Sequence, residues 1–587
     1  MSALTAVLAP EVPPPAGPCP PLPGDVVLGT CLPMIDDAEV RQAARMINTL
    51  PAVTQLQEAI TKTLGRKRKL SVQTLFIGLL LTAVHGESTV LRRVYETLQL
   101  RISQDARTEL GLPRRPRTRT ASDAGYRALL RVFHAVIEVV NPSAWQVTRA
   151  LVLRTEPRPR RKITRAEQQE AAETLLILVN DLLEQTWQQL PAEVRAQWNG
   201  DLGLDATPIP AYSRGRNKYS HHHSAEPDGG WYVREGDHRD RDSNPDPLAK
   251  PGAKKPSKHI FGFEASTAVP GSRHLTEFSL IPRLVLAVTL HKPGQEPGLN
   301  GFAILRDLHR RGHPAGLIGA DRNYNNAEPT KLQLPSRALG YGWLFDYRDD
   351  QLGVRASNSG GAIQVEGSWY CPSMPEKLIK ATILFRAKQI DEATWKARIH
   401  ARTAYLLRPK GHSDTEGHQR HLCPASGTRG CTALCSLKTH PAGWKPAHPL
   451  PVVFPVSRPV KELPLVCDQD SITTAPTDGA KFAQDLQYGT DEQQAAYRSL
   501  RQAVEGQNSY IKDGSREGLA DPTRRRVRGI AAQTLLSGFL LAANNLRAIR
   551  SWLARAVRDN DGVLKARKRR RRTSLLSEYN DPGTPIP

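Results

Sequence analysis

Three charged residues near the C-terminus have a spacing that places them on one side of a helix. Residues 497–512 contain no proline and are rich in helix-forming types up to Glu505, and acidic residues precede them. Along such a helix Arg501, Glu505 and Lys512 fall at i, i+4 and i+11, so a carboxylate lies between two cations. This face suits a metal-bound phosphate. The competing interpretation is an ordinary solvated helix with an Arg–Glu pair.

Two aspartates upstream stand where short buried strands are expected to end. Residues 201–210 are compatible with such a strand, with prolines that limit its ladder bonds near Asp205. Asp201 is the rival carboxylate, and we prefer Asp205 because Leu202 and Leu204 share one strand face, whereas Asp205 falls beside Thr207. A second short apolar run, 315–320, leads directly to Asp321. Each aspartate alone is more often a turn or capping residue, so the weight comes from the set.

The helix resembles the Tyr-Arg-Glu-Lys signature of bacterial insertion-sequence DDE transposases, which has the form Y-(2)-R-(3)-E-(6)-K. The spacing of Arg501, Glu505 and Lys512 matches this signature in full. Three residues separate Tyr497 from Arg501 where the family has two, so the sequence departs from the pattern at the tyrosine.

The two aspartates resemble the remaining motifs of the same family. Asp205 stands in Leu-Asp-Ala-Thr, which is similar to the segment of the first catalytic aspartate. Asp321 and Arg322 stand in Ala-Asp-Arg-Asn-Tyr, which is similar to the second motif, usually Asp-Arg-Gly-Tyr. Asn323 replaces the glycine, and asparagine tolerates left-handed backbone better than most residues.

The resemblance implies a fold and a chemistry. The fold is α/β: an RNase H-like mixed sheet flanked by helices, interrupted by a β-rich insertion and preceded by an all-α N-terminal domain. Asp205, Asp321 and Glu505 would hold two Mg²⁺ or Mn²⁺ ions, which prefer oxygen ligands. Arg501 and Lys512 would bind phosphates of the DNA. Arg322 and Tyr497 are weaker DNA-binding candidates. 

The resemblance also implies a function: metal-dependent cleavage of DNA at the ends of an insertion sequence, followed by strand transfer into target DNA. One alternative is an RNase H-like nuclease that cuts without strand transfer. Another is a non-catalytic DNA-binding protein derived from a transposase. A homodimer in the synaptic complex is the oligomer expected.

Charge and composition favour a polyanionic partner. The chain has 587 residues with 81 Lys and Arg against 58 Asp and Glu, so 81 − 58 gives a net charge of +23. Nucleic acid is the leading partner for such a chain, and a membrane surface is the competing one. No apolar run approaches the roughly 20 residues needed to span a bilayer. Seven cysteines without a regular framework favour a reducing compartment, and we expect a bacterial cytoplasmic, nucleoid-associated protein.

The chain divides by composition into six segments. Helix starts are expected at Ser71, at Ser122-Asp123 and at Thr164, where Glu167 completes a capping box. The expected segments are a Pro-rich disordered N-terminus (1–40), a helical DNA-binding domain (41–198), the first part of the catalytic core (199–348), a β-rich insertion (349–470), the C-terminal helices of the core (471–560) and a basic disordered tail (561–587).

The insertion contains the cysteines that could bind a structural metal. Four thiolates in a small, strand-poor domain can close a tetrahedral zinc site, and the candidates are Cys371, Cys423, Cys431 and Cys435. Their spacing is not a standard zinc pattern. Reduced, partly buried cysteines are the favoured interpretation.

Overall fold

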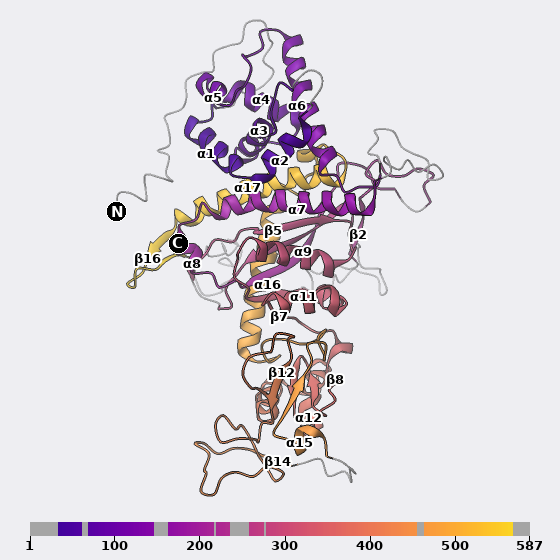
Figure 1. Cartoon of the computed structure of the whole chain (residues 1–587), viewed down its shortest axis with the longest axis vertical. Helices are drawn as coiled ribbons and strands as arrows, with labels where there is room; N and C mark the ends of the chain where they lie inside the picture. The colour runs from indigo at the N-terminus through magenta and orange to yellow at the C-terminus, as the bar shows by residue number, and fades with distance from the viewer. Residues whose placement is uncertain are drawn as a thin grey trace, which may run out of the picture.

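The protein is elongated, with N-terminal helices at one end, a sheet in the middle and the insertion at the other end (Figure 1). The structure, a computed structural model, describes residues 33–61, 68–145, 163–216, 219–234, 258–274, 278–454 and 463–567. Residues 1–32 of the expected disordered N-terminus and residues 568–587 of the expected basic tail lie outside this range. The described ends of both segments are ordered, contrary to the prediction: a helix begins at Asp37, and residues 564–567 form a strand. In the described part of the chain, no helix is long and apolar enough to cross a membrane.

A mixed sheet forms the centre of the molecule, as the α/β prediction required. Its order is β2-β3-β1-β6-β7, and β5 also pairs with β3. Strand β3 is antiparallel to β1, whereas β1, β6 and β7 are mutually parallel neighbours. The bounds are β1 Leu202–Pro210, β2 Gly230–Arg234, β3 Lys258–Pro270, β5 Ala287–His291, β6 Leu317–Ala320 and β7 Gly342–Leu344. A separate short strand, β4 (Phe278–Ser279), precedes β5 in the chain.

The two faces of the sheet are covered differently because side chains alternate along each strand. Leu202, Leu204 and Ile318 pack into one apolar core with α9 (Pro297–Arg310). The intervening positions of the same strands face α16 (Asp491–Lys512), which packs on β1, β3 and β6. Thr490 caps α16 by accepting from the backbone of Gln493, and the helix predicted over 497–512 is confirmed.

The N-terminal part of the chain is helical, as predicted. Ser71 caps α3, and Thr164 with Glu167 forms the predicted capping box of α7. The predicted start at Ser122 is wrong: α6 begins three residues earlier, because Thr118 accepts from the backbone of Ala121. The helices are α1 Asp37–Asn48, α2 Pro51–Ile60, α3 Val72–Val84, α4 Leu91–Glu96, a π-helical turn Thr97–Arg101, α5 Gln104–Glu109, α6 Arg119–Val139, α7 Arg165–Trp187 and α8 Ala192–Ala196.

These helices share their core with the last long helix. Helix α17 (Ile530–Leu553) lies beside α7 across the middle of the molecule in Figure 1. Phe76 of α3 packs edge-on against Phe539 of α17, with ring centroids 5.3 Å apart. One continuous apolar cluster joins the N-terminal helices, α17 and the sheet residues Ile209 and Phe263. The N-terminal helices are thus built onto the sheet through α17.

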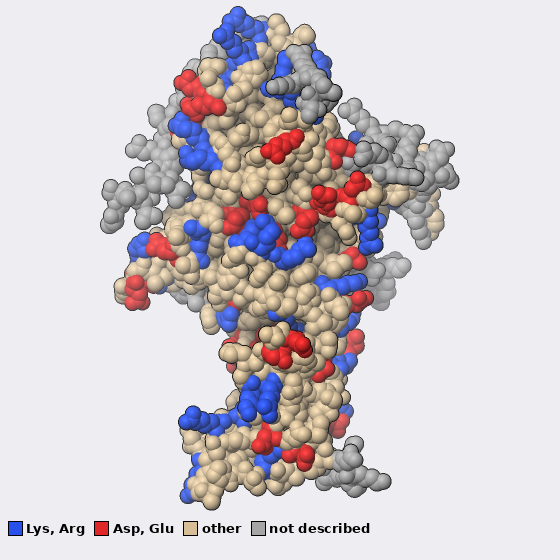
Figure 2. Space-filling view, viewed as in Figure 1, with Lys and Arg blue, Asp and Glu red and all other residues tan. Residues whose placement is uncertain are grey.

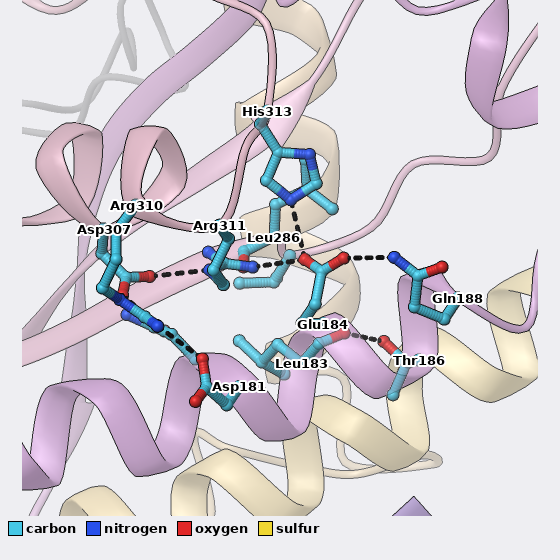
Figure 3. Close-up of polar contacts among 12 residues, drawn as sticks. Asp181, Leu183, Glu184, Thr186, Gln188, Leu286, Asp307, Arg310, Arg311 and His313 are labelled. Atoms are coloured by element: carbon cyan, nitrogen blue, oxygen red, sulfur yellow. Dashed lines mark hydrogen bonds and ion pairs between the residues drawn. The ribbon is translucent and has the colours of Figure 1, made fainter. Parts of the chain in front are cut away.

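A buried ionic cluster ties α7 to the loop that leads into β6 (Figure 3). Glu184 accepts from Arg311 and from His313, each at 2.7 Å, and Arg311 also pairs with Asp307 at 2.9 Å. The pKa of Glu184 is lowered to about 2: burial alone would raise it, but the hydrogen bond and charge of His313 and the charge of Arg311 outweigh burial. The cluster fixes the start of β6 relative to α7, and with it the position of Asp321, which follows β6.

The segment between β7 and α16 contains helices as well as the short strands that we expected. Its strands form sheets of two or three strands: β8 Val354–Ser357, β9 Ile363–Val365, β10 Ser368–Tyr370, β11 Arg408–Pro409, β12 Gln419–Leu422, β13 Leu434–Cys435, β14 Val452–Val453 and β15 Ser471–Thr474. Its helices are α12 Glu376–Ile379, α13 Ala381–Arg386, α14 Glu392–Ala401 and α15 Leu465–Asp468. Arg402 and Glu366 form an ion pair here with neither side chain exposed.

Short elements complete the core. Two small helices follow β6, and the chain after α17 forms a hairpin that pairs with β4. Their bounds are α10 Arg322–Asn325, α11 Gln333–Ala338, β16 Ala556–Arg558 and β17 Leu564–Arg567, with 3-10 turns at Pro329–Lys331, Asp349–Gln351, Arg402–Tyr405 and Pro522–Arg525.

Candidate active site

Glycines let α16 lie directly on the strands that carry the aspartates. A Cβ on Gly203 would fall 2.4 Å from the carbonyl oxygen of Leu500, and a Cβ on Gly319 would fall 2.7 Å from the Cβ of Leu500. Both distances are shorter than real side chains tolerate, so the close approach of helix and sheet requires glycine. Because side chains repeat every second residue in a strand, the positions two residues on, Asp205 and Asp321, share this face.

The two aspartates are neighbours in the sheet. Leu204 of β1 pairs with Ala320 of the parallel strand β6, so the next residue along each strand is Asp205 and Asp321 respectively. Asp321 also caps α10, because its carboxylate accepts from the backbone of Arg322 at 2.6 Å. The end of β6 therefore both turns the chain and presents a carboxylate beside that of Asp205.

Asp205 is largely enclosed by groups from α16. Its side chain is 16% exposed, and its Oδ1 lies 3.4 Å from Nη1 of Arg501. Burial raises the pKa of Asp205, the charge of Arg501 opposes this rise, and the charges of Asp321 and Glu505 add to it. The carboxyl group therefore depends on a nearby positive charge to remain ionised.

Arg501 bridges two of the three predicted carboxylates. Its Nη2 lies 2.7 Å from Oε1 of Glu505, one helical turn along α16, while its Nη1 faces Asp205. Burial lowers the pKa of Arg501, but the negative charges of Asp205 and Glu505 outweigh burial, so the pKa is raised. Glu505 itself is 58% exposed, so it stands at the open side of the group.

The last predicted cation of the helix lies farther along β1. Nζ of Lys512 donates to Oγ1 of Thr207 at 2.7 Å, two residues beyond Asp205 on the same strand face. Between them, Asn508 faces Asp205, with Nδ2 3.4 Å from its Oδ2, and accepts from Thr267 at 2.9 Å. Asn508 was missed in the sequence, although its position, three residues after Glu505, places it on the same helix face.

Arg322 is held by a carboxylate that the sequence analysis did not identify. Its guanidinium lies 2.6 Å from Asp346, which follows β7. Asp346 also pairs with Arg386 of α13 at 2.8 Å and accepts from the hydroxyl of Tyr488 at 2.8 Å. This cluster joins the insertion to the site, and no short motif in the sequence marks it.

A broad cleft of about 620 Å³ opens at the junction of these elements. Tyr497 lines it together with Arg501, since an interval of four residues places both on one helix face. Burial raises the pKa of Tyr497. Asp205 is not among the lining residues and lies behind Arg501. The other residues that line the cleft include Asp321, Arg322, Asp346, Tyr488, Arg498, Gln502 and Glu505.

Asp201, the rival of Asp205, has a structural environment. It is buried, and its two oxygens accept from Nε and Nη2 of Arg273, each at 2.8 Å. The backbone of Leu317, at the start of β6, donates to it at 2.9 Å. Asp201 thus helps to join β1 to β6, while Asp205 faces the helix.

The three carboxylates are suitable ligands for a divalent cation, although their side chains are not arranged in a metal-binding geometry. Among the residues that the structure describes, no three His, Cys, Asp or Glu side chains form a metal-binding group. Asp205, Asp321 and Glu505 nevertheless offer the oxygen donors that Mg²⁺ and Mn²⁺ prefer. Arg501 occupies the position between two of them.

Comparison with known proteins identifies no relative: no family model, curated protein or solved structure matches this chain.

Proposed function

We propose that this protein is a DDE transposase with an RNase H-like core, which cuts DNA at the ends of an insertion sequence and joins those ends to target DNA. The observation that carries the proposal is the placement of Asp205 and Asp321 side by side on parallel strands, with Arg501 linking Asp205 to Glu505 on the facing helix. The strand order, with three parallel strands beside an antiparallel pair, supports the RNase H-like assignment.

The three carboxylates are the proposed ligands of two Mg²⁺ or Mn²⁺ ions. Asp205, Asp321 and Glu505 would hold them through their carboxylate oxygens. The ions would supply charge stabilisation at the phosphorus and would lower the pKa of a bound water. Arg501 would exchange its contacts with Asp205 and Glu505 for contacts with a phosphate, which guanidinium groups bind through paired hydrogen bonds.

The other charged residues take supporting roles in the proposal. Lys512 lies beside Thr207 on the same strand face as Asp205, so its ammonium group can meet a DNA phosphate next to the one being cut. Tyr497 and Arg322 line the cleft, where they would contact the DNA flanking the scissile bond. The pair with Asp346 would hold the guanidinium of Arg322 at the cleft.

The proposed reaction has two steps and needs no external energy source. In the first, water attacks phosphorus at the end of the element, the P–O3′ bond breaks, and a free 3′-hydroxyl remains. In the second, that 3′-hydroxyl attacks a phosphodiester of target DNA and displaces another 3′-oxygen. Each step breaks one P–O bond and forms one.

The N-terminal helices provide the proposed DNA-binding surface. Arg114, Arg117 and Arg119 are exposed at the start of α6. Figure 2 shows Lys and Arg side chains at the outer end of these helices, in a chain with a net charge of +23. Cations clustered in this way favour phosphate contacts. We further propose that two copies act together in the synaptic complex.

The test is metal-dependent cleavage of DNA that carries the element's own ends, by the purified protein and by Glu505→Gln. We expect Mg²⁺ or Mn²⁺ to support cleavage and strand transfer, and Glu505→Gln to abolish both while end binding persists. Glu492→Gln is the matched control, because Glu492 lies exposed in the first turn of the same helix.

Each other outcome points to a different function. Equal activity in the protein and in Glu505→Gln would overturn the site assignment. Cleavage without joining to a labelled target would favour an RNase H-like nuclease. Binding without cleavage in every variant would favour a transposase-derived DNA-binding protein.

A further inference from the structure

Four cysteines from separate segments line one small cavity in the insertion. Cys371 follows β10, Cys423 follows β12, Cys435 ends β13, and Cys467 lies in α15. The cavity they line measures about 10 Å³, which is the space of a single water or ion. Four sulfurs from four segments around so small a space are the arrangement that a tetrahedral thiolate site requires.

Two of the four thiols interact with each other, and backbone N–H groups donate to two of the sulfurs. The thiols of Cys371 and Cys467 share a hydrogen bond. The backbone N–H of Ser373 donates to the sulfur of Cys371, and the backbone N–H of Ala425 donates to that of Cys423. Hydrogen bonds from backbone N–H groups stabilise the charged form of an acceptor and orient metal ligands.

A buried cation completes the surroundings. Lys438 lines the same cavity, and its side chain is 5% exposed. Its Nζ donates to the carbonyl of Gln469 at 2.8 Å and lies 3.5 Å from Asp470. Four thiolates around a divalent ion leave a net negative charge, which a nearby ammonium group offsets.

The apolar cluster beside the four cysteines is small. In the described part of the chain it contains seven buried residues, namely Ala362, Cys371, Leu407, Ala433, Val453, Val466 and Ile472. The strands that it joins are two to four residues long. Folds with so small a core usually depend on a metal or on disulfides.

We propose that Cys371, Cys423, Cys435 and Cys467 bind a structural Zn²⁺ ion that holds the outer part of the insertion together. This ligand set corrects the sequence-based one, because Cys431 does not line the cavity and its thiol donates to the carbonyl of Ala433 at 2.9 Å. As described above, the four side chains do not yet form a metal-binding group. On this proposal, the four side chains would turn about χ1 until their sulfurs surround the ion at the Zn–S distance of about 2.3 Å.

The test is the zinc content of the full-length protein, purified under reducing conditions, measured for the unaltered chain, Cys467→Ser and Cys431→Ser. We expect about one zinc ion per chain in the unaltered protein and in Cys431→Ser, and a loss of most of it in Cys467→Ser. Replacement of zinc by Co²⁺ should give the intense visible absorption of tetrahedral cobalt thiolate in the unaltered protein and in Cys431→Ser, but not in Cys467→Ser.

A second measurement covers the case in which Cys467→Ser fails to fold. In the unaltered protein, a chelator should increase alkylation at the four proposed ligands, read by mass spectrometry, and leave Cys431 unchanged. The proposal is overturned if the unaltered protein takes up no zinc, if Cys431→Ser loses as much as Cys467→Ser, or if Cys371 and Cys467 are joined by a disulfide. None of these readouts depends on DNA cleavage.

Discussion

Glu184 gives the chain a measurable dependence of stability on pH. The pKa of Glu184 falls from 4.5 to about 2 on folding, because His313 and Arg311 bind the carboxylate. A shift of this size corresponds to about 3 kcal/mol of folding free energy. Because the folded-state pKa is the lower one, this stabilisation is complete above the unfolded pKa and is lost as pH falls toward about 2.

The substitution Glu184→Gln removes the titrating group, so the pH dependence that Glu184 contributes to the unfolding free energy should disappear. Between about pH 7 and about pH 3.5, the unaltered protein should lose about 1.4 kcal/mol more of its unfolding free energy than Glu184→Gln does. At neutral pH the variant should be less stable by about 2–3 kcal/mol, since Arg311 keeps Asp307 but loses a charged partner. Urea titrations followed by circular dichroism at both pH values measure these differences.

Glu173→Gln is the matched control for this experiment. It lies on the same helix, and its pair with Arg306 is exposed on both sides, at 44% and 50%. Exposed pairs contribute at most about 1 kcal/mol, so Glu173→Gln should follow the unaltered protein at both pH values. Equal pH dependence in the unaltered protein and in Glu184→Gln would refute the reasoning, because the low pKa of Glu184 could not then be a source of stability.

Two further substitutions test the core and the insertion. Glu366→Gln removes the carboxylate that pairs with the fully buried Arg402, so it should lower the unfolding free energy by about 3–5 kcal/mol. Glu376→Gln, in an exposed pair, should change the unfolding free energy by less than about 1 kcal/mol. Urea titration measures both changes. Gly203→Ala forces a Cβ against the backbone of Leu500, so it should lower the unfolding free energy by about 1–3 kcal/mol and reduce DNA cleavage. Gly514→Ala places its Cβ in open space and should leave cleavage unchanged.

The sequence could predict the elements around the site because their signals are local. Capping at Ser71 and at Thr164 is encoded within four residues, and both helices begin where the sequence indicated. The strand ends before Asp205 and Asp321 follow from short apolar runs. The glycines two residues before each aspartate were also visible, but their purpose appears only when α16 is seen to lie on them.

Other parts of the structure depend on residues that are distant in the sequence. Phe76 and Phe539 pack together although 463 positions separate them, so composition alone made the N-terminal helices look like a separate domain. No sequence motif marked Asp346, because its partners Arg322, Arg386 and Tyr488 come from three separate parts of the chain. Cys467 was likewise not among the cysteines considered, because only folding brings it to the cavity that Cys371, Cys423 and Cys435 line.

The charge balance around Arg501 explains how the three carboxylates can lie together in the folded protein. Asp205, Asp321 and Glu505 carry three negative charges when ionised, and the guanidinium of Arg501 offsets one of them. Burial raises the pKa of Asp205, and the remaining repulsion from Asp321 and Glu505 adds to this rise. Any cation that binds these carboxylates therefore relieves repulsion and frees Arg501 for an anion. On the proposed function, arrival of metal ions and of a DNA phosphate would favour each other for this electrostatic reason.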